Sequence, residues 1–271
     1  MLVCSQGVAE FAYPLLSTLT LMGEKCTVFS KPLFDVLEEK SPHTVIISPE
    51  EHPEIEQARK EYDFNLIFFG ISQSSIAPDI WCLPENTPAK ILKKFPNSFP
   101  FRMVADVAKL GQPKYDKNYE YDLLYISDKK QTRPEIIDFI IRMSVSKHSL
   151  CIVGPEQIPV PQYLGNASLK ERNILLSSCK IGIDFPSFPN TLNFYFRKKP
   201  VVTNGGDYVE KQVEEMLGDA EKRDRIGLMN HNQTILSKRT NFHITAEVFG
   251  LLGMEDIVKQ CQQHIEASGL S

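Results

Sequence analysis

The chain has 271 residues, which exceeds the usual size of one domain and suits two domains of about 100–150 residues each. With 42% hydrophobic and 24% charged residues, the composition excludes an intrinsically disordered chain. The net charge of −4 gives no overall attraction to nucleic acid or to an anionic membrane. No apolar run approaches the roughly 18–20 residues of a membrane span, and the N-terminus lacks a signal-peptide pattern, so we expect a cytoplasmic protein.

The first seventy residues alternate short apolar runs with amphipathic stretches, as in a parallel sheet covered by helices. The predicted strands are 1–4, 26–29, 44–47 and 65–69, and the predicted helices are 8–22, 32–39 and 53–62. The nearly continuous apolar run at 65–69 suits a central strand that is buried on both faces. Residues 72–101 are less periodic and richer in Pro, Ser and Asn, which predicts loops with one helix near 89–94.

A second α/β rhythm follows residues 109–120, which are poor in apolar side chains and form the best linker candidate. The predicted strands are 121–126, 150–153, 180–185 and 200–203, and the predicted helices are 132–143, 168–179, 191–196 and most of 207–264. Capping boxes at 132–135 and 168–171 mark two helix starts. We therefore expect two Rossmann-like domains, 1–108 and 121–250, followed by a C-terminal helix at 251–271.

Residues 168–204 carry the most specific pattern of the chain. A helix ends in Ser-Ser-Cys-Lys-Ile-Gly-Ile, and a strand, a short helix and Pro-Val-Val-Thr-Asn follow. This succession resembles the donor-nucleotide region of GT-B glycosyltransferases. The segments 221–223, 231–236 and 240–246 resemble the C-terminal helices of CgeB-like spore-maturation proteins, which are similar to group 1 glycosyl transferases. The resemblance covers 121–250 and implies an α/β GT-B fold with a helical C-terminal tail, an acceptor-side N-terminal domain and a cleft between the domains.

The resemblance implies an enzyme, a glycosyltransferase of the hexosyltransferase kind. It would move a sugar from a nucleotide-sugar donor, a UDP-sugar being one candidate, to an acceptor hydroxyl without a metal ion. No Asp-x-Asp motif is present, and the His and Cys residues do not cluster at metal-ligand spacing, so we expect no metal and no cofactor beyond the co-substrate. Asn193 stands where the family has a Glu that binds the donor ribose. Arg197 replaces a small residue, so either the donor differs or the activity is lost.

The predicted donor side lies at the carboxyl ends of the C-terminal strands, where ligands of open α/β sheets bind. Ser127, Lys129, Lys130 and Arg133 follow the first of these strands. Their positive charges and the adjacent helix N-terminus suit a leaving diphosphate, although a solvated basic loop is the alternative. Gly154 follows the next strand as the edge of a base pocket or as a plain turn.

Three further donor-side candidates, Ser187, Asn190 and Thr191, precede the short helix at 191–196. Their hydroxyl and amide groups suit phosphate or sugar hydroxyls at the start of that helix, or they serve only as helix caps. Asn193, on the helix itself, and Arg197, which directly follows it, complete the predicted donor-binding set.

The acceptor-side candidates follow strands of the N-terminal half and are Gln6, Gly7, Ser72 and Gln73. Gly7 permits a close approach of the backbone to a ligand. Glu10, one helical turn further, is the first candidate for a general base that deprotonates the acceptor hydroxyl, although a surface carboxylate favoured by the helix dipole is the alternative. Asp106 is the second candidate base.

Other functions remain open at this level. Asn193 in place of the family Glu favours a GT-B-like nucleotide-binding or regulatory module without turnover. A viral or phage DNA-base glucosyltransferase is a further alternative, although the net charge disfavours a nucleic-acid partner. A nucleotide-sugar epimerase lacks a cluster of acids and bases. The sugar, the acceptor and the oligomeric state are not predicted.

Overall fold

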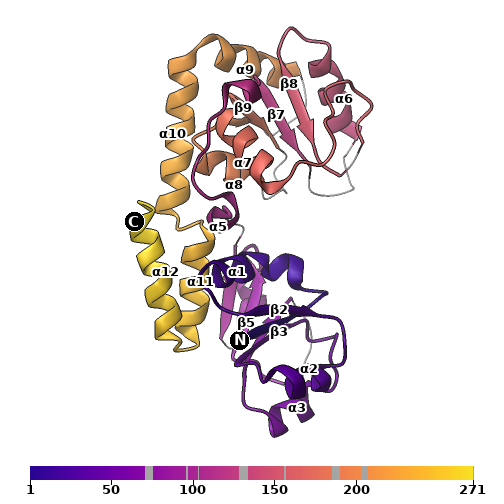
Figure 1. Ribbon diagram of the computed structural model, residues 1–271, viewed down its shortest axis with the longest axis vertical. Coiled ribbons are helices and arrows are strands. Elements are labelled where there is room, and N and C mark those ends of the chain that lie inside the picture. The colour runs from indigo at the N-terminus through magenta and orange to yellow at the C-terminus, as the bar shows by residue number, and fades with distance from the viewer. Residues whose placement is uncertain are drawn as a thin grey trace. The chain divides into compact units, whose positions relative to one another are not determined.

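The computed structural model describes residues 1–70, 76–95, 97–102, 104–127, 134–155, 157–184, 190–202 and 207–270. The chain divides into two compact units, which are shown in Figure 1. Unit 1 comprises residues 1–104 and 239–271, and unit 2 comprises residues 105–238. No helix in these described ranges combines the length and the hydropathy that a membrane span requires.

Unit 1 contains a six-stranded parallel sheet in the order β2-β1-β3-β4-β5-β6. Its strands are β1 Leu2–Ser5, β2 Cys26–Phe29, β3 Thr44–Ile47, β4 Asn65–Phe69, β5 Ile80–Pro84 and β6 Ser98–Phe101. The predicted central position of 65–69 is confirmed, since β4 pairs with strands on both sides. The prediction that 72–101 consists mainly of loops is wrong at β5 and β6, which are strands of this sheet. Pro100 is tolerated because β6 is an edge strand, where a missing N–H does not interrupt a ladder.

The helices of unit 1 cover both faces of this sheet because its strands alternate their side chains between two cores. Leu2 and Cys4 face one core, whereas Val3 faces the other. The helices are α1 Ala9–Leu21, α2 Leu33–Lys40, α3 Ile55–Glu61, α4 Ala89–Leu92, α11 Asn241–Leu251 and α12 Glu255–Ala267. The first core contains side chains of α1, α11 and α12, and the second contains side chains of α2 and α3.

Unit 2 contains a four-stranded parallel sheet in the order β10-β9-β7-β8. Its strands are β7 Leu123–Ile126, β8 Leu150–Val153, β9 Ile181–Ile183 and β10 Val201–Val202. Its helices are α5 Val107–Leu110, the 3-10 helix η1 Lys117–Tyr119, α6 Pro134–Ser144, α7 Leu169–Ser178, α8 Asn190–Phe196, α9 Asp207–Gly218 and α10 Ala220–Leu236. The capping box predicted at 168–171 is present, since Ser168 Oγ accepts from Glu171 N and the Glu171 carboxylate accepts from Ser168 N.

The unit boundaries differ from those suggested by the sequence, which assigned 121–250 to the second domain. Residues 239–250 belong to unit 1 because α11 packs against α1. Ile244, Val248 and Phe249 of α11 are fully buried in the core that α1 shares. The buried Asn241 Nδ2 also donates to Thr18 Oγ1 of α1 at 2.8 Å.

Residues 109–120, the predicted linker, are fastened to the body of unit 2. Four backbone groups between 111 and 116 bind side chains of α7 and of Arg197, which directly follows α8. These hydrogen bonds are Arg197 Nη2 to Gly111 O (2.7 Å), Asn173 Nδ2 to Gln112 O (2.9 Å), Lys114 N to Ser177 Oγ (3.1 Å) and Asp116 N to Ser178 Oγ (2.9 Å). The segment is therefore part of unit 2 and does not act as a free connection.

Candidate functional site

The carboxyl ends of β7 and β8 in unit 2 bring two predicted residues together, Ser127 and Gly154. Ile126 pairs with Val153 in the sheet, so the two residues that follow are neighbours. Ser127 N donates to Val153 O at 2.9 Å, and Ser127 is only 6% exposed. Gly154 has a φ of +150°, and a Cβ added there would overlap the carbonyl oxygen of Ser127. Only glycine fits this turn, which lies where open α/β sheets bind ligands.

Asp184 lies at the carboxyl end of β9, beside the same edge of the sheet. Tyr125 pairs with Ile183, which places Asp184 level with the end of β7. The Asp184 carboxylate is 1% exposed and accepts a hydrogen bond from Thr191 Oγ1 at 2.7 Å. Thr191, a predicted donor-side residue, is therefore held near the end of β9. Sequence reasoning missed Asp184, although an acidic residue that ends an apolar strand was a usable signal.

Asn193 and Asp106, two other predicted residues, also meet in unit 2. Asn193 Oδ1 accepts from the backbone N–H of Asp106 at 3.0 Å. This contact ties α8 to the start of the segment 106–116. The side chain that stands at the position of the family Glu thus has a packing contact within its own unit. Its predicted contact with a donor ribose stays a prediction.

Arg197 is buried at the C-terminal end of α8, with 6% of its surface exposed. Its Nη2 donates to Gly111 O at 2.7 Å and to Asn173 Oδ1 at 2.6 Å, and its guanidinium lies over the Phe196 ring. Burial lowers the pKa of Arg197 to about 10, since desolvation disfavours the charged form. The described contacts of Arg197 therefore serve the packing of unit 2, and its predicted contact with a phosphate stays a prediction.

Several predicted residues cannot be placed by their side chains. Ser72, Gln73, Lys129, Lys130, Arg133 and Ser187 lie outside the described residues. Glu10 belongs to α1 and Asn190 begins α8, but the described part of the chain includes only their backbones. The roles predicted for these residues stay predictions.

In unit 1, the carboxyl end of β1 carries a second group of polar side chains. Ser5 is buried, with 1% of its surface exposed, and its Oγ donates to the Glu51 carboxylate. Gly7 lies directly beneath that carboxylate, because an added Cβ would overlap Glu51 Oε1. Gln6 is exposed, and its N–H donates to Phe29 O at 2.8 Å. The predicted acceptor-side residues Gln6 and Gly7 therefore lie beside Glu51, a carboxylate that sequence reasoning missed.

The comparisons with known proteins give no match by sequence: no family model and no curated protein matches the chain. Solved structures do match. CalG4, the calicheamicin glycosyltransferase, has a TM-score of 0.51 and 10% identity, covering 93% of this chain and 98% of that one. SnogD, a glycosyltransferase from Streptomyces nogalater, has a TM-score of 0.53 and 10% identity, covering 92% and 98%. The spinosyn forosaminyltransferase SpnP has a TM-score of 0.53 and 9% identity, covering 93% and 99%.

The fold is GT-B. The predicted fold class, with two Rossmann-like domains, is thereby confirmed. At about 10% identity this likeness concerns the fold alone. The narrower resemblance to CgeB-like proteins gains no support from a family model and stays a prediction.

Metal ligands are not grouped in the described part of this GT-B chain, where no three His, Cys, Asp or Glu side chains could hold one ion. All six cysteines are free, and five of them are buried. Burial, followed by the charge of Glu51, raises the pKa of Cys4 to about 12. The Cys4 thiol is therefore protonated at neutral pH and is no nucleophile.

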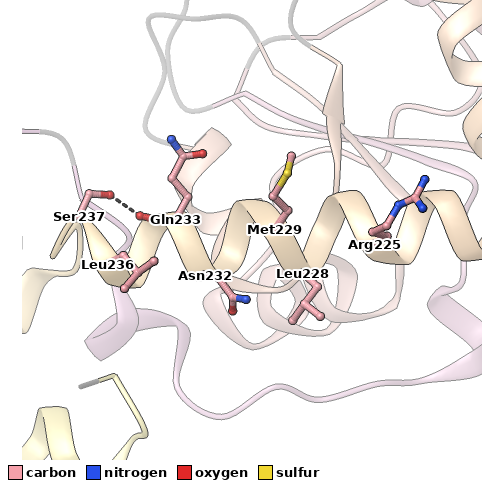
Figure 2. A pocket seen from close by; sticks show the side chains of 7 residues that line it. All are labelled: Arg225, Leu228, Met229, Asn232, Gln233, Leu236 and Ser237. Carbon is pink, nitrogen blue, oxygen red and sulfur yellow. Dashed lines mark hydrogen bonds between the residues drawn. The ribbon is translucent and has the colours of Figure 1, made fainter.

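A pocket lies along α10, and Figure 2 shows the side chains that line it. All of them belong to α10 or directly follow it: Arg225, Leu228, Met229, Asn232, Gln233, Leu236 and Ser237. None belongs to a loop that follows a strand. This pocket is therefore separate from the residues at the carboxyl ends of β7, β8 and β9.

Proposed function

We propose that this chain is a glycosyltransferase that transfers a sugar from a nucleotide-sugar donor to an acceptor hydroxyl without a metal ion. Unit 2 would bind the donor and unit 1 the acceptor, as the resemblance to CgeB-like enzymes implies. The observation that carries the proposal is the GT-B fold with polar side chains at the carboxyl edge of each sheet: Ser127, Asp184 and Thr191 in unit 2, and Ser5 and Glu51 in unit 1.

The edge of unit 2 supports donor binding through its chemistry. The Thr191 hydroxyl donates to the buried Asp184 carboxylate, so its oxygen is oriented to accept a hydrogen bond from a ribose or sugar hydroxyl. Gly154 is packed against the Ser127 carbonyl at this edge, so the backbone there carries no side chain that would stand between a ligand and the strand ends. The nucleotides to be screened are UDP, GDP, dTDP and ADP, of which UDP is the first candidate.

A thermal-shift screen tests the proposal. A nucleotide that binds only the folded chain stabilises it by about 2.7 kcal/mol at a hundred times its Kd, which raises the melting temperature by several degrees. Thr191→Val should reduce that shift because it removes the hydroxyl that binds Asp184. Thr234→Val is the matched control, since Thr234 is a buried threonine of α10 whose Oγ1 donates to Asn230 O in its own helix.

The result would be negative if none of these nucleotides or their sugars raised the melting temperature. A reduced shift in Thr191→Val, with an unchanged one in Thr234→Val, would locate the donor at the edge of unit 2. Equal shifts in both variants would place the nucleotide elsewhere.

A second candidate is a nucleotide-binding module without turnover. It is favoured by Asn193, which brings no charge to the position of the family Glu and accepts a hydrogen bond from Asp106 N. Release of free nucleoside diphosphate from a bound nucleotide sugar separates the two functions. A transferase hydrolyses its donor slowly in water, whereas the binding module only binds it.

A further inference from the structure

Glu51 is brought back over the end of β1 by a tight turn after β3. The two strands are parallel neighbours in register, with Cys4 opposite Ile46, so both end at the same edge of the sheet. Glu51 N donates to Ser48 O at 3.2 Å, which closes the turn. The Glu51 carboxylate, which belongs to the loop after β3, thus lies against the loop that follows β1.

The two oxygens of this carboxylate have different surroundings. Oε2 accepts from Ser5 Oγ, whose side chain is buried, so this oxygen is anchored. Oε1 lies against Gly7, which is exposed and has no side chain to cover it. Glu51 itself is exposed, so the carboxylate is fixed in direction and reachable by a ligand. A general base must come within hydrogen-bond reach of the proton that it takes, and Oε1 is the oxygen of this carboxylate that lies on the exposed side.

We propose that Glu51 is the general base that takes the proton of the acceptor hydroxyl, an inference that rests on the proposed function. Glu51 Oε1 accepts the hydroxyl proton while the hydroxyl oxygen forms its bond to the anomeric carbon of the donor. The bond from that carbon to the phosphate oxygen breaks, and the nucleoside diphosphate leaves with the electron pair. The proton on Glu51 then exchanges with solvent. Ser5 and Gly7 are positioning residues, which orient the carboxylate and leave space beside it.

The experiment measures release of nucleoside diphosphate from UDP-glucose, UDP-N-acetylglucosamine and GDP-mannose, with water in the place of the acceptor. On the sugar nucleotide that the native chain hydrolyses, Glu51→Gln should lower kcat by about 10²–10⁴-fold. It should leave the melting-temperature shift caused by that nucleotide unchanged. Glu50→Gln, which neutralises the exposed neighbouring carboxylate, is the matched control and should retain native kcat.

A double-mutant cycle tests the positioning role of Gly7. Gly7→Ala should lower kcat by displacing the Glu51 carboxylate, without changing the nucleotide-induced shift. In the Glu51→Gln background, Gly7→Ala should cause no further loss, because the group it displaces is no longer a base. Additive losses would show that Gly7 acts through packing alone and would overturn its role as a positioning residue.

The outcomes separate this inference from the proposed function. If the native chain releases no nucleotide from any of the three donors, the proposed function fails and the inference falls with it. If the native chain is active and Glu51→Gln stays within about twofold of it, only the inference is overturned, and Glu10→Gln and Asp106→Asn then test the two other candidate bases. Should Glu51→Gln not fold, Glu51→Asp, which withdraws the charge by one methylene, should still cost at least about tenfold in kcat.

Discussion

At the scale of single residues, a side chain's type did not reveal its partner. Arg197 has the charge that a diphosphate needs, yet its guanidinium is buried and binds Gly111 O and Asn173 Oδ1. Both of these acceptors are neutral, one a backbone carbonyl and the other a side-chain amide. The first acceptor belongs to the segment 106–116 and the second to α7, and only the fold brings both of them to Arg197.

Arg197→Lys should therefore destabilise unit 2. Lysine keeps the charge but loses the planar fork through which Nη2 reaches two acceptors, and we expect a loss of about 1–3 kcal/mol in the free energy of unfolding. Urea denaturation measures it. Lys198→Arg, at the exposed neighbouring position, should change stability by less than about 0.5 kcal/mol. A stable Arg197→Lys variant with a weaker nucleotide-induced shift would instead support the donor contact predicted from the sequence.

The candidate site was only partly predictable from single residues. Gly154 was predicted because it follows a strand, and Thr191 because it precedes a short helix, in a region where the resemblance implies a donor site. Asp184 and Glu51 were missed because a lone carboxylate after a strand is a weak signal that belongs to no motif. Their importance depends on what the fold places beside them, Thr191 for one and Ser5 for the other.

At the scale of elements, α10 is fastened to the end of α8 by a close contact. Gly227 of α10 lies against the turn after α8, and an added Cβ would overlap the carbonyl oxygen of Lys198. The His231 ring Nδ1 lies 2.9 Å from Phe196 O, which is one of the last carbonyls of α8. Lys198 has a φ of +57°, so this turn is in the left-handed region and has little freedom to retreat.

Gly227→Ala should accordingly destabilise unit 2, by about 1–3 kcal/mol, because the methyl group meets backbone and not a flexible side chain. Chemical denaturation followed by far-UV circular dichroism measures the loss. Gly218→Ala, at the end of α9, is the matched control, and it should raise the free energy of unfolding instead of lowering it. Nothing lies within 4 Å of its added Cβ, so the gain in helix propensity should stabilise the chain by up to about 1 kcal/mol. Equal effects of the two substitutions would contradict the contact.

Elements with a clear hydrophobic period were predictable, whereas others were not. The spans 26–29, 44–47 and 65–69 match β2, β3 and β4 because apolar runs and flanking turns define them. The strands β5 and β6 were missed, since each is short and contains a proline that reads as a loop residue. What makes them strands is the pairing that β4 offers to β5, and β5 to β6.

At the scale of the whole molecule, the described hydrophobic cores do not mix the two units. The clusters that contain Phe68 and Phe249 draw on residues 2–104 and 244–261, and those that contain Phe139 and Phe194 draw on residues 119–226. The return of the chain at 239 to complete the first core could not be predicted from the sequence. The apolar side chains of a helix such as α11 predict that the helix is buried, but they do not predict against which sheet it packs.

Two separate cores should unfold in two steps, and a substitution in one core should move one step only. Phe249→Ala removes a fully buried ring of α11 and should cost about 3–5 kcal/mol, lowering the transition of unit 1 in calorimetry. Phe139→Ala removes an equally buried ring of α6 and should lower the transition of unit 2. A bound nucleotide should raise the second transition and not the first, because the proposed donor site belongs to unit 2. If either substitution moved both transitions equally, or if one transition accounted for all the heat, the two cores would have to unfold as one cooperative block.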